Sequence, residues 1–180
     1  KVTFLAYDWA FYQGVLLTPE DFAESLLVPD AYIDIGAYTS LAPVGETVTP
    51  HGCGTYHLHI LLDETPRQYT LALPEIFSAY RLYLSGQLIH VNGEPEPDNY
   101  QPSIQSEEIT FTASEEVDIL LAVSDFSHYY SGLIYPPAFG EQQKVTQLLS
   151  VQLIIQSVRS FLALLLAISY LVLFFTGGKD

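Results

Sequence analysis

TYHLHILL, residues Thr55 to Leu62, decides the fold class, because it alternates large apolar side chains with polar ones. In an extended chain, one face then carries only apolar side chains, those of Tyr56, Leu58, Ile60 and Leu62. A period of two is typical of a strand with one buried face. The stretch therefore predicts a half-buried β-strand whose polar face carries His57 and His59.

The same period of two recurs along the chain, in runs that begin at Tyr69, Tyr80, Ile109 and Val117. Ser85-Gly86 predicts a tight turn, so residues 79–91 are expected to form a hairpin. Short strands with turns and no helices between them favour an antiparallel β-sandwich or jelly roll over a βαβ fold. These strands should share one core, made of Tyr56, Leu58, Ile60, Leu82, Leu84, Ile119 and Leu121.

The flanking parts of the sandwich are less regular. Residues 1–17 indicate one or two strands, and Thr18 followed by Pro19 predicts the start of a short helix that runs to Leu26. Pro and Gly punctuate residues 29–54, which we expect to be rich in loops. The last strand of the domain is expected to include residues 133–139.

An apolar run, SFLALLLAISYLVLFFTGG, follows at Ser160 to Gly178 and carries no charge over nineteen residues. A helix of this length extends about 28 Å, close to the roughly 30 Å of a membrane's hydrocarbon core. A buried core helix is the alternative, but such helices usually keep a polar stripe, and this run is apolar all round. We expect a transmembrane helix, with the remainder of a larger protein following it.

Between sandwich and membrane, residues 141–159 contain no Pro or Gly and are expected to be helical. Apolar positions recur at alternating spacings of three and four, as in coiled coils: Leu148, Val151, Ile155 and Val158. We call these four residues the seam; they should contact either a second copy or the chain's own domain. The predicted organisation is a globular domain at 1–140, a juxtamembrane helix at 141–159 and a transmembrane helix at 160–178.

Composition limits the functions that this chain can have. The 180 residues include 21 acidic and six basic ones, a formal net charge of −15, which argues against nucleic-acid binding. The surface remains compatible with cations, neutral sugars or basic peptides. A single cysteine, Cys53, allows no internal disulfide. Because no Gly-x-Ser-x-Gly elbow or other catalytic pattern stands out, we expect no catalytic residue and no cofactor in this segment.

Two groups of polar residues are candidate sites. The loop that follows the last alternating run combines a carboxylate with aromatic and hydroxyl groups, as a site for a small polar ligand would: Asp125, His128, Tyr129 and Tyr130. The tyrosines have a structural alternative as buried side chains with satisfied hydroxyls. His57 and His59 could share a metal ion or report acidification, but two ligands are too few for us to predict a metal site.

Five segments, in this order, resemble a bacterial receptor module: WAFYQGVLLTPEDF (Trp9 to Phe22), PDAYIDIGAYTS (Pro29 to Ser40), GCGTYHLHILL (Gly52 to Leu62), SAYRLYLSGQLIHVNG (Ser78 to Gly93) and ILLAVSDFSHYYSGL (Ile119 to Leu133). The module is the extracytoplasmic jelly-roll domain of seven-transmembrane receptors with diverse intracellular signalling modules. That domain is itself similar to the sugar-binding domain of family 2 glycoside hydrolases. The apolar run at 160–178 resembles the first of the receptor's seven membrane helices.

The resemblance implies a sensor in the cell membrane, with residues 1–159 extracytoplasmic and a histidine kinase or diguanylate cyclase as the output. The expected partners are membrane lipid and a small polar ligand such as a sugar or peptide, and the seam adds a second copy of the chain as a possible partner. A passive carbohydrate-binding-like or dimerisation module is the alternative function. The family usually has a Pro-Gly-Ser-Trp-like segment where this chain has Tyr38, so Tyr38 would take over that tryptophan's contact with the ligand. Trp9 is a further candidate contact.

Overall fold

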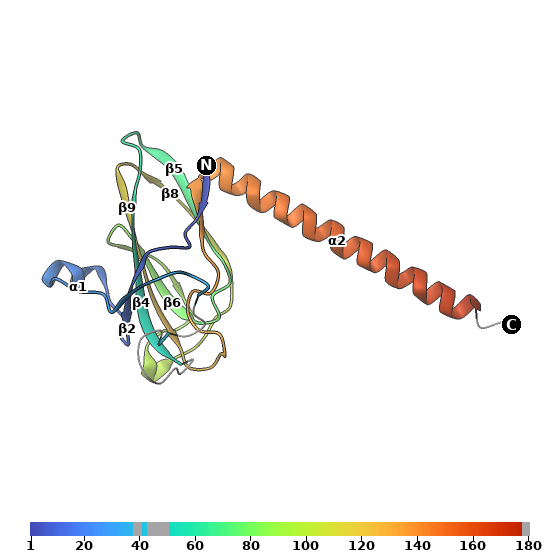
Figure 1. Cartoon of the computed structure of the whole chain (residues 1–180), viewed down its shortest axis with the longest axis horizontal. Coiled ribbons are helices and arrows are strands. Elements are labelled where there is room, and N and C mark those ends of the chain that lie inside the picture. Colours follow the sequence, from blue (N-terminus) through green and yellow to red (C-terminus); the bar gives the residue numbers. More distant parts are fainter. Residues whose placement is uncertain (38–40, 43–50, 178–180) are drawn as a thin grey trace. The chain divides into compact units, whose positions relative to one another are not determined.

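The computed structural model describes residues 1–37, 41–42 and 51–177, and two compact units divide the chain at Gln142. The first unit, Lys1–Gln142, is a sandwich of two antiparallel sheets (Figure 1). The four-stranded sheet has the order β1 (Val2–Phe4), β10 (Ala138–Glu141), β5 (Arg67–Leu73) and β8 (Glu107–Ala113). The six-stranded sheet has the order β3 (Ala31–Ile33), β2 (Trp9–Gln13), β4 (Gly52–Leu61), β9 (Glu116–Asp125), β6 (Ala79–Leu84) and β7 (Gln87–Asn92). The predicted antiparallel sandwich is confirmed.

The core lies between the sheets and contains the residues that the alternation selects. Tyr56 of β4 lies opposite Leu121 of β9, which in turn lies opposite Leu82 of β6. In-phase registers therefore bring the apolar faces of three strands together. Five of the seven predicted core side chains are buried, and the other two, Leu58 and Ile60, are partly buried against the same cluster. The predicted core is confirmed.

The β6–β7 hairpin forms at the predicted turn. Ser85 and Gly86 have φ angles of 45° and 83°, so both central residues lie in the left-handed region that a two-residue type I′ turn requires. The pairing of the two strands shifts register between Leu82 and Tyr83, as at a β-bulge.

The predicted short helix is α1, which spans Pro19–Glu24. The Asp21 carboxylate accepts hydrogen bonds from the backbone N–H and the hydroxyl of Thr18, at 2.8 Å and 3.0 Å, and so holds the helix start. The helix stops two residues before Leu26, because Ser25 is extended and its side chain bonds back to the carbonyl of Asp21.

Two expectations about strands are wrong. Strand β10 begins only at Ala138. It pairs with a strand on each side, so its residues need backbone N–H groups for hydrogen bonds, and Pro136 and Pro137 have none. In the expected loop region, residues 31–33 form β3, an edge strand on β2, and β4 starts three residues early at Gly52. A 3-10 turn, η1 (Pro97–Asn99), lies in the loop before β8.

Helix α2 spans Gln142–Gly177, 36 residues, and runs without a break through both helical segments that the sequence predicts. At roughly 1.5 Å per residue it is about 54 Å long. By length and composition, this helix could cross a membrane, with a mean hydropathy of 2.2 in its most apolar stretch. The long apolar C-terminal helix is confirmed.

Candidate functional site

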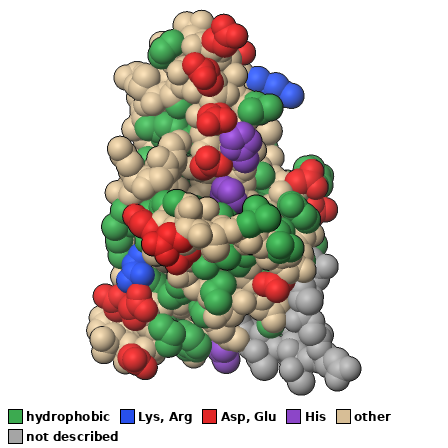
Figure 2. All heavy atoms as spheres, turned by 90° about the vertical axis from the view of Figure 1, so that its left-hand side faces the viewer, with side chains coloured by type: hydrophobic (Ala, Val, Ile, Leu, Met, Phe, Trp, Pro, Cys, Tyr) green, Lys and Arg blue, Asp and Glu red, His purple; other side chains and the backbone are tan. Residues whose placement is uncertain are grey.

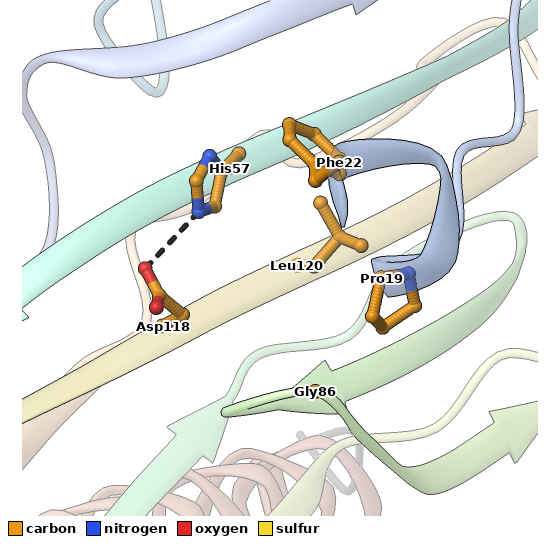
Figure 3. A pocket seen from close by; sticks show the side chains of 6 residues that line it. All are labelled: Pro19, Phe22, His57, Gly86, Asp118 and Leu120. Carbon is orange, nitrogen blue, oxygen red and sulfur yellow. Dashed lines mark hydrogen bonds and ion pairs between the residues drawn. The ribbon is translucent and has the colours of Figure 1, made fainter. Parts of the chain in front are cut away.

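A hollow of about 220 Å³ lies on the outer face of the six-stranded sheet, beside α1 and the β6–β7 turn (Figure 3). It is lined by Pro19, Phe22, His57, Gly86, Asp118 and Leu120. Figure 3 shows the polar pair, His57 and Asp118, at one end and the apolar side chains at the other. We call this space the α1 hollow.

One carboxylate oxygen of Asp118 makes hydrogen bonds with two histidine side chains. This oxygen, Oδ1, lies 3.2 Å from Nε2 of His57 and 2.9 Å from Nδ1 of His59. Because an ionised carboxylate only accepts hydrogen bonds, each imidazole must donate through the nitrogen that faces it. Both rings are therefore fixed in orientation, and in the neutral state each leaves its other nitrogen as an acceptor.

The other ring nitrogen of His59 points to a second carboxylate, because Nε2 lies 3.6 Å from Oε2 of Glu116. A neutral His59 would present a lone pair there, whereas a protonated ring presents an N–H to each acid. The hydrogen bond to Asp118, followed by the charges of Asp118 and Glu116, accordingly raises the pKa of His59 above its ordinary value of 6.5.

Replacing His59 with Gln should remove a pH-dependent part of the stability. Since folding raises the pKa of His59, its stabilising contribution is complete below pH 6.5 and is lost as the pH rises through the folded-state value. The side chain is 45% exposed, so we expect less than about 1 kcal/mol. Urea unfolding of wild type and His59→Gln should differ at pH 5.5 and converge at pH 8.5. An equal difference at both values would contradict this prediction.

The apolar end of the hollow is built by α1 and the segment that leads to it. Thr55 of β4 holds that segment in place with two hydrogen bonds. Its hydroxyl accepts one from the N–H of Leu17 and donates one to the carbonyl of Val15, both at 2.8 Å. The ring of Phe22 then lies 5.0 Å from that of His57 and 5.3 Å from that of Tyr12. Aromatic contacts at these separations fix the Phe22 side chain as one wall.

Charge around the hollow is predominantly negative. Burial raises the pKa of the Tyr83 phenol, and the carboxylates of Glu20 and Asp21 raise it further, so these α1 acids act on the sheet surface beside the hollow. Arg81 on the same strand is paired, at 2.7 Å from Glu96 and 3.7 Å from Glu94. Figure 2 shows acidic and histidine side chains close together on this face.

The loop after β9 is the candidate that the sequence predicted, and its carboxylate is buried. Asp125 is fully buried, and its Oδ1 accepts from the Tyr100 hydroxyl at 3.0 Å and from the N–H groups of Ser127 and His128 at 2.8 Å and 3.0 Å. Its Oδ2 accepts from the Ser131 hydroxyl at 2.9 Å. Asp125 therefore organises the loop from within and does not face a ligand.

The aromatic side chains of that loop do reach solvent. Tyr129 is 76% and Tyr130 is 50% exposed, with their rings packed edge to face at 5.0 Å. The His128 ring lies 6.2 Å from that of Phe77. The structure thus brings these three predicted ligand contacts together on the surface.

Trp9 is not one of the exposed aromatic side chains. The Trp9 side chain is fully buried, donates its indole N–H to the Leu5 carbonyl at 2.9 Å and packs edge to face on Tyr56. It belongs to the core, out of reach of a ligand. Tyr38 lies outside the described residues.

On α2 the seam is partly exposed, with the side chains of Val151, Ile155 and Val158 at 46–53% exposure.

No local sequence pattern predicts the α1 hollow. His57 and His59 fall on a polar strand face, but their partner, Asp118, lies sixty-one residues from His57 on another strand. The sequence feature that points to Asp118 is the alternation in β9, which puts Asp118 and Leu120 on the outer face of the sheet and Ile119 in the core. Among the described residues, no three His, Cys, Asp or Glu side chains are placed so as to hold a metal ion.

The fold of this chain is similar to parts of several solved enzyme structures. The chain is similar to part of the β-glucuronidase of Faecalibacterium prausnitzii, with a TM-score of 0.54 and 15% identity over 77% of this chain and 31% of that one. A GH2 β-galacturonidase from Eisenbergiella tayi bound to galacturonate gives 0.52 and 11%, over 78% of this chain and 24% of that one. A Ruminococcus gnavus β-glucuronidase in complex with D-glucaro-d-lactam gives 0.53 and 12%, over 77% and 29%.

No family model matches the sequence, and no curated protein does either. The chain spans less than a third of the length of these enzymes, and at such identities the likeness concerns the fold alone. The chain is therefore an antiparallel β-sandwich of a fold found in part of these enzymes, followed by a long apolar helix that could cross a membrane.

Proposed function

We propose that this chain is the extracytoplasmic ligand-sensing domain of a bacterial membrane signalling receptor, together with its first membrane helix. The output, a histidine kinase or diguanylate cyclase, would lie in the cytoplasm. The observation that carries the proposal is the junction between the two units. Glu141 is the last residue of β10, and Gln142 is the first residue of α2.

Since β10 and α2 are consecutive in the chain, we propose that strain passes from the strand to the helix. Strand β10 pairs with β1 on one side and β5 on the other, and a displacement of the sheet would therefore be passed along the chain to the helix. A passive anchor has no need of such a connection and would tolerate a loop there. A sensor must in addition bind its ligand with different affinities in two arrangements of the helix.

The length of α2 indicates which part of the helix a second copy of the chain would contact. A membrane takes up about 30 Å, or roughly 20 residues of helix, which leaves about 16 of the 36 residues outside it. If the membrane span is 160–178, the seam lies in the exposed part, where an apolar stripe is unfavourable in water. We propose that the seams of two copies pair, and that ligand binding alters this pairing.

Cysteine crosslinking in membranes tests the proposal. In a Cys53→Ser background, Val151→Cys and Ile155→Cys should each form disulfide-linked dimers, and Gln152→Cys and Gln156→Cys on another side of the helix serve as matched controls. A cognate compound from a library of sugars, short peptides and divalent ions should change the crosslinking rate at the seam about fivefold or more, a coupling typical of allosteric proteins.

Two results would contradict this function. Stronger crosslinking at the two glutamine positions would reject the seam. A compound that binds, as judged by a raised melting temperature, without changing any crosslinking rate would reject signal transmission through α2.

A passive carbohydrate-binding-like module is the second candidate, and the exposed Tyr129 and Tyr130 favour it. Exposed aromatic side chains on a loop can stack on a sugar without any movement of the scaffold. Such a module would bind its ligand through these rings and leave the crosslinking of α2 unchanged.

A further inference from the structure

We propose that the α1 hollow binds a small organic amine, whose ammonium group pairs with Asp118 and whose apolar body lies against Phe22 and Leu120. The inference deepens the proposed sensing function and rests on it, because it names the chemical class of the ligand.

The first argument is an available carboxylate oxygen. Both imidazoles bond to Oδ1 of Asp118, and within the described residues no hydrogen bond reaches Oδ2. The Asp118 side chain is 43% exposed and lines the hollow. Figure 3 shows it facing the same space as the apolar wall. A bound ammonium group could therefore donate to Oδ2 without displacing either histidine.

The second argument is charge selection. No Lys or Arg is among the residues that line the hollow, while Glu116, Glu20 and Asp21 add negative charge around it. Arg81, the basic residue that acts on neighbouring Tyr83, is already paired with two glutamates. An anionic ligand would be repelled by Asp118 and the acids around it, whereas a cation would be attracted.

The third argument is size and polarity. A volume of about 220 Å³ is below the roughly 300 Å³ at which sites for drug-sized ligands begin, so the ligand is small. The wall away from Asp118 consists of Pro19, Phe22 and Leu120, which offer no hydrogen bond from their side chains. A compact apolar group is favoured there over a ring that carries a hydroxyl on each carbon.

His59 makes this binding depend on pH. A protonated His59 offsets the charge of Asp118 and Glu116, which it contacts, and so competes with a bound cation. The other titratable or charged groups that act on this surface are Tyr83, Glu20, Asp21 and Arg81. Amine binding should therefore strengthen as the pH rises over this interval.

Benzylamine, benzyl alcohol and benzoate test the proposal, because they differ in charge at nearly constant shape. The full chain in phosphatidylcholine nanodiscs, with empty nanodiscs as the control, would be titrated at pH 8 and followed by ligand-observed NMR. Benzylamine should bind at least tenfold more tightly than benzyl alcohol, and benzoate should not bind. Equal binding of the amine and the alcohol, or tighter binding of a neutral sugar in the same space, would overturn the proposal.

Two variants locate the site. Asp118→Asn should weaken benzylamine binding at least tenfold, whereas Glu108→Gln removes the same charge from the other sheet and should leave binding unchanged. Lowering the pH to 5.5 should weaken binding several-fold in wild type and less in His59→Gln. Equal losses in Asp118→Asn and Glu108→Gln would show a general charge effect and refute the site. The comparison of the three ligands on the wild-type chain tests the proposal independently of any effect of Asp118→Asn on folding.

The binding result and the receptor proposal can fail separately. Benzylamine that binds at Asp118 but leaves seam crosslinking unchanged would reject the receptor and retain the amine site. Crosslinking that responds to another compound, in a chain that does not bind benzylamine, would do the reverse.

Discussion

Asp125→Ala is expected to destabilise the β-sandwich by about 3–5 kcal/mol. The change removes a fully buried carboxylate that accepts four hydrogen bonds, and it leaves the donors on Tyr100, Ser127, His128 and Ser131 without their acceptor. Hydrogen bonds to a charged group contribute about 1.5–3 kcal/mol each, and their losses are not additive. Urea unfolding followed by the fluorescence of Trp9, the single tryptophan and a buried one, measures the effect.

Asp125→Asn is the matched control for this prediction. An amide oxygen can still accept the three bonds that reach Oδ1, and its NH₂ group can donate to the Ser131 hydroxyl, so only the charge is lost. We expect a cost of about 1–2 kcal/mol. If the alanine variant is no less stable than the asparagine variant, the carboxylate does not hold the loop.

Gly132→Ala is expected to destabilise the sandwich by about 2–4 kcal/mol. Gly132 has a φ of +79°, where an alanine is strained by about 1 kcal/mol. A Cβ there would also collide with the hydroxyl of Tyr56 and lie 2.9 Å from Leu41, both buried side chains with little room to move. Overpacking of this kind typically adds about 1–3 kcal/mol.

Gly86→Ala separates the two causes. Gly86 has a similar φ of +83°, but a Cβ at that position meets nothing within 4 Å. Gly86→Ala should therefore lower the free energy of unfolding only by the backbone strain, about 1 kcal/mol. Equal melting temperatures for the two variants would show that the packing of Gly132 against Tyr56 is of no consequence.

The position of Gly132 links the aromatic loop to the core. The hydroxyl of Tyr56 accepts the N–H of Leu133 at 3.2 Å, and Ser131 and Asp125 hold the start of the same turn. Burial raises the pKa of Tyr56 to about 12, so its hydroxyl stays protonated at physiological pH. The exposed Tyr129 and Tyr130 are thus displayed on a turn whose two ends are fixed from inside the sandwich.

Local sequence by itself determined the strands with one buried face, the β6–β7 hairpin and the apolar helix. Each follows from a short-range rule: a period of two sorts Tyr56 from His57, Ser85-Gly86 supplies two positive φ angles, and a long uncharged apolar run is stable as a helix in a membrane. The apolar pattern of residues 133–137 favours a strand, but Pro136 and Pro137 prevent it.

Only the tertiary structure decided where the polar groups meet. The register of β4 against β9 sets His59 opposite Asp118 and thereby creates the α1 hollow, and no local pattern specifies that pairing. Burial likewise separates Asp125 from the exposed tyrosines a few residues later, and it places Trp9 in the core. The physical reason is that periodicity assigns a side chain to a face, whereas its partners come from segments tens of residues away that only the packed sheets bring within hydrogen-bonding distance.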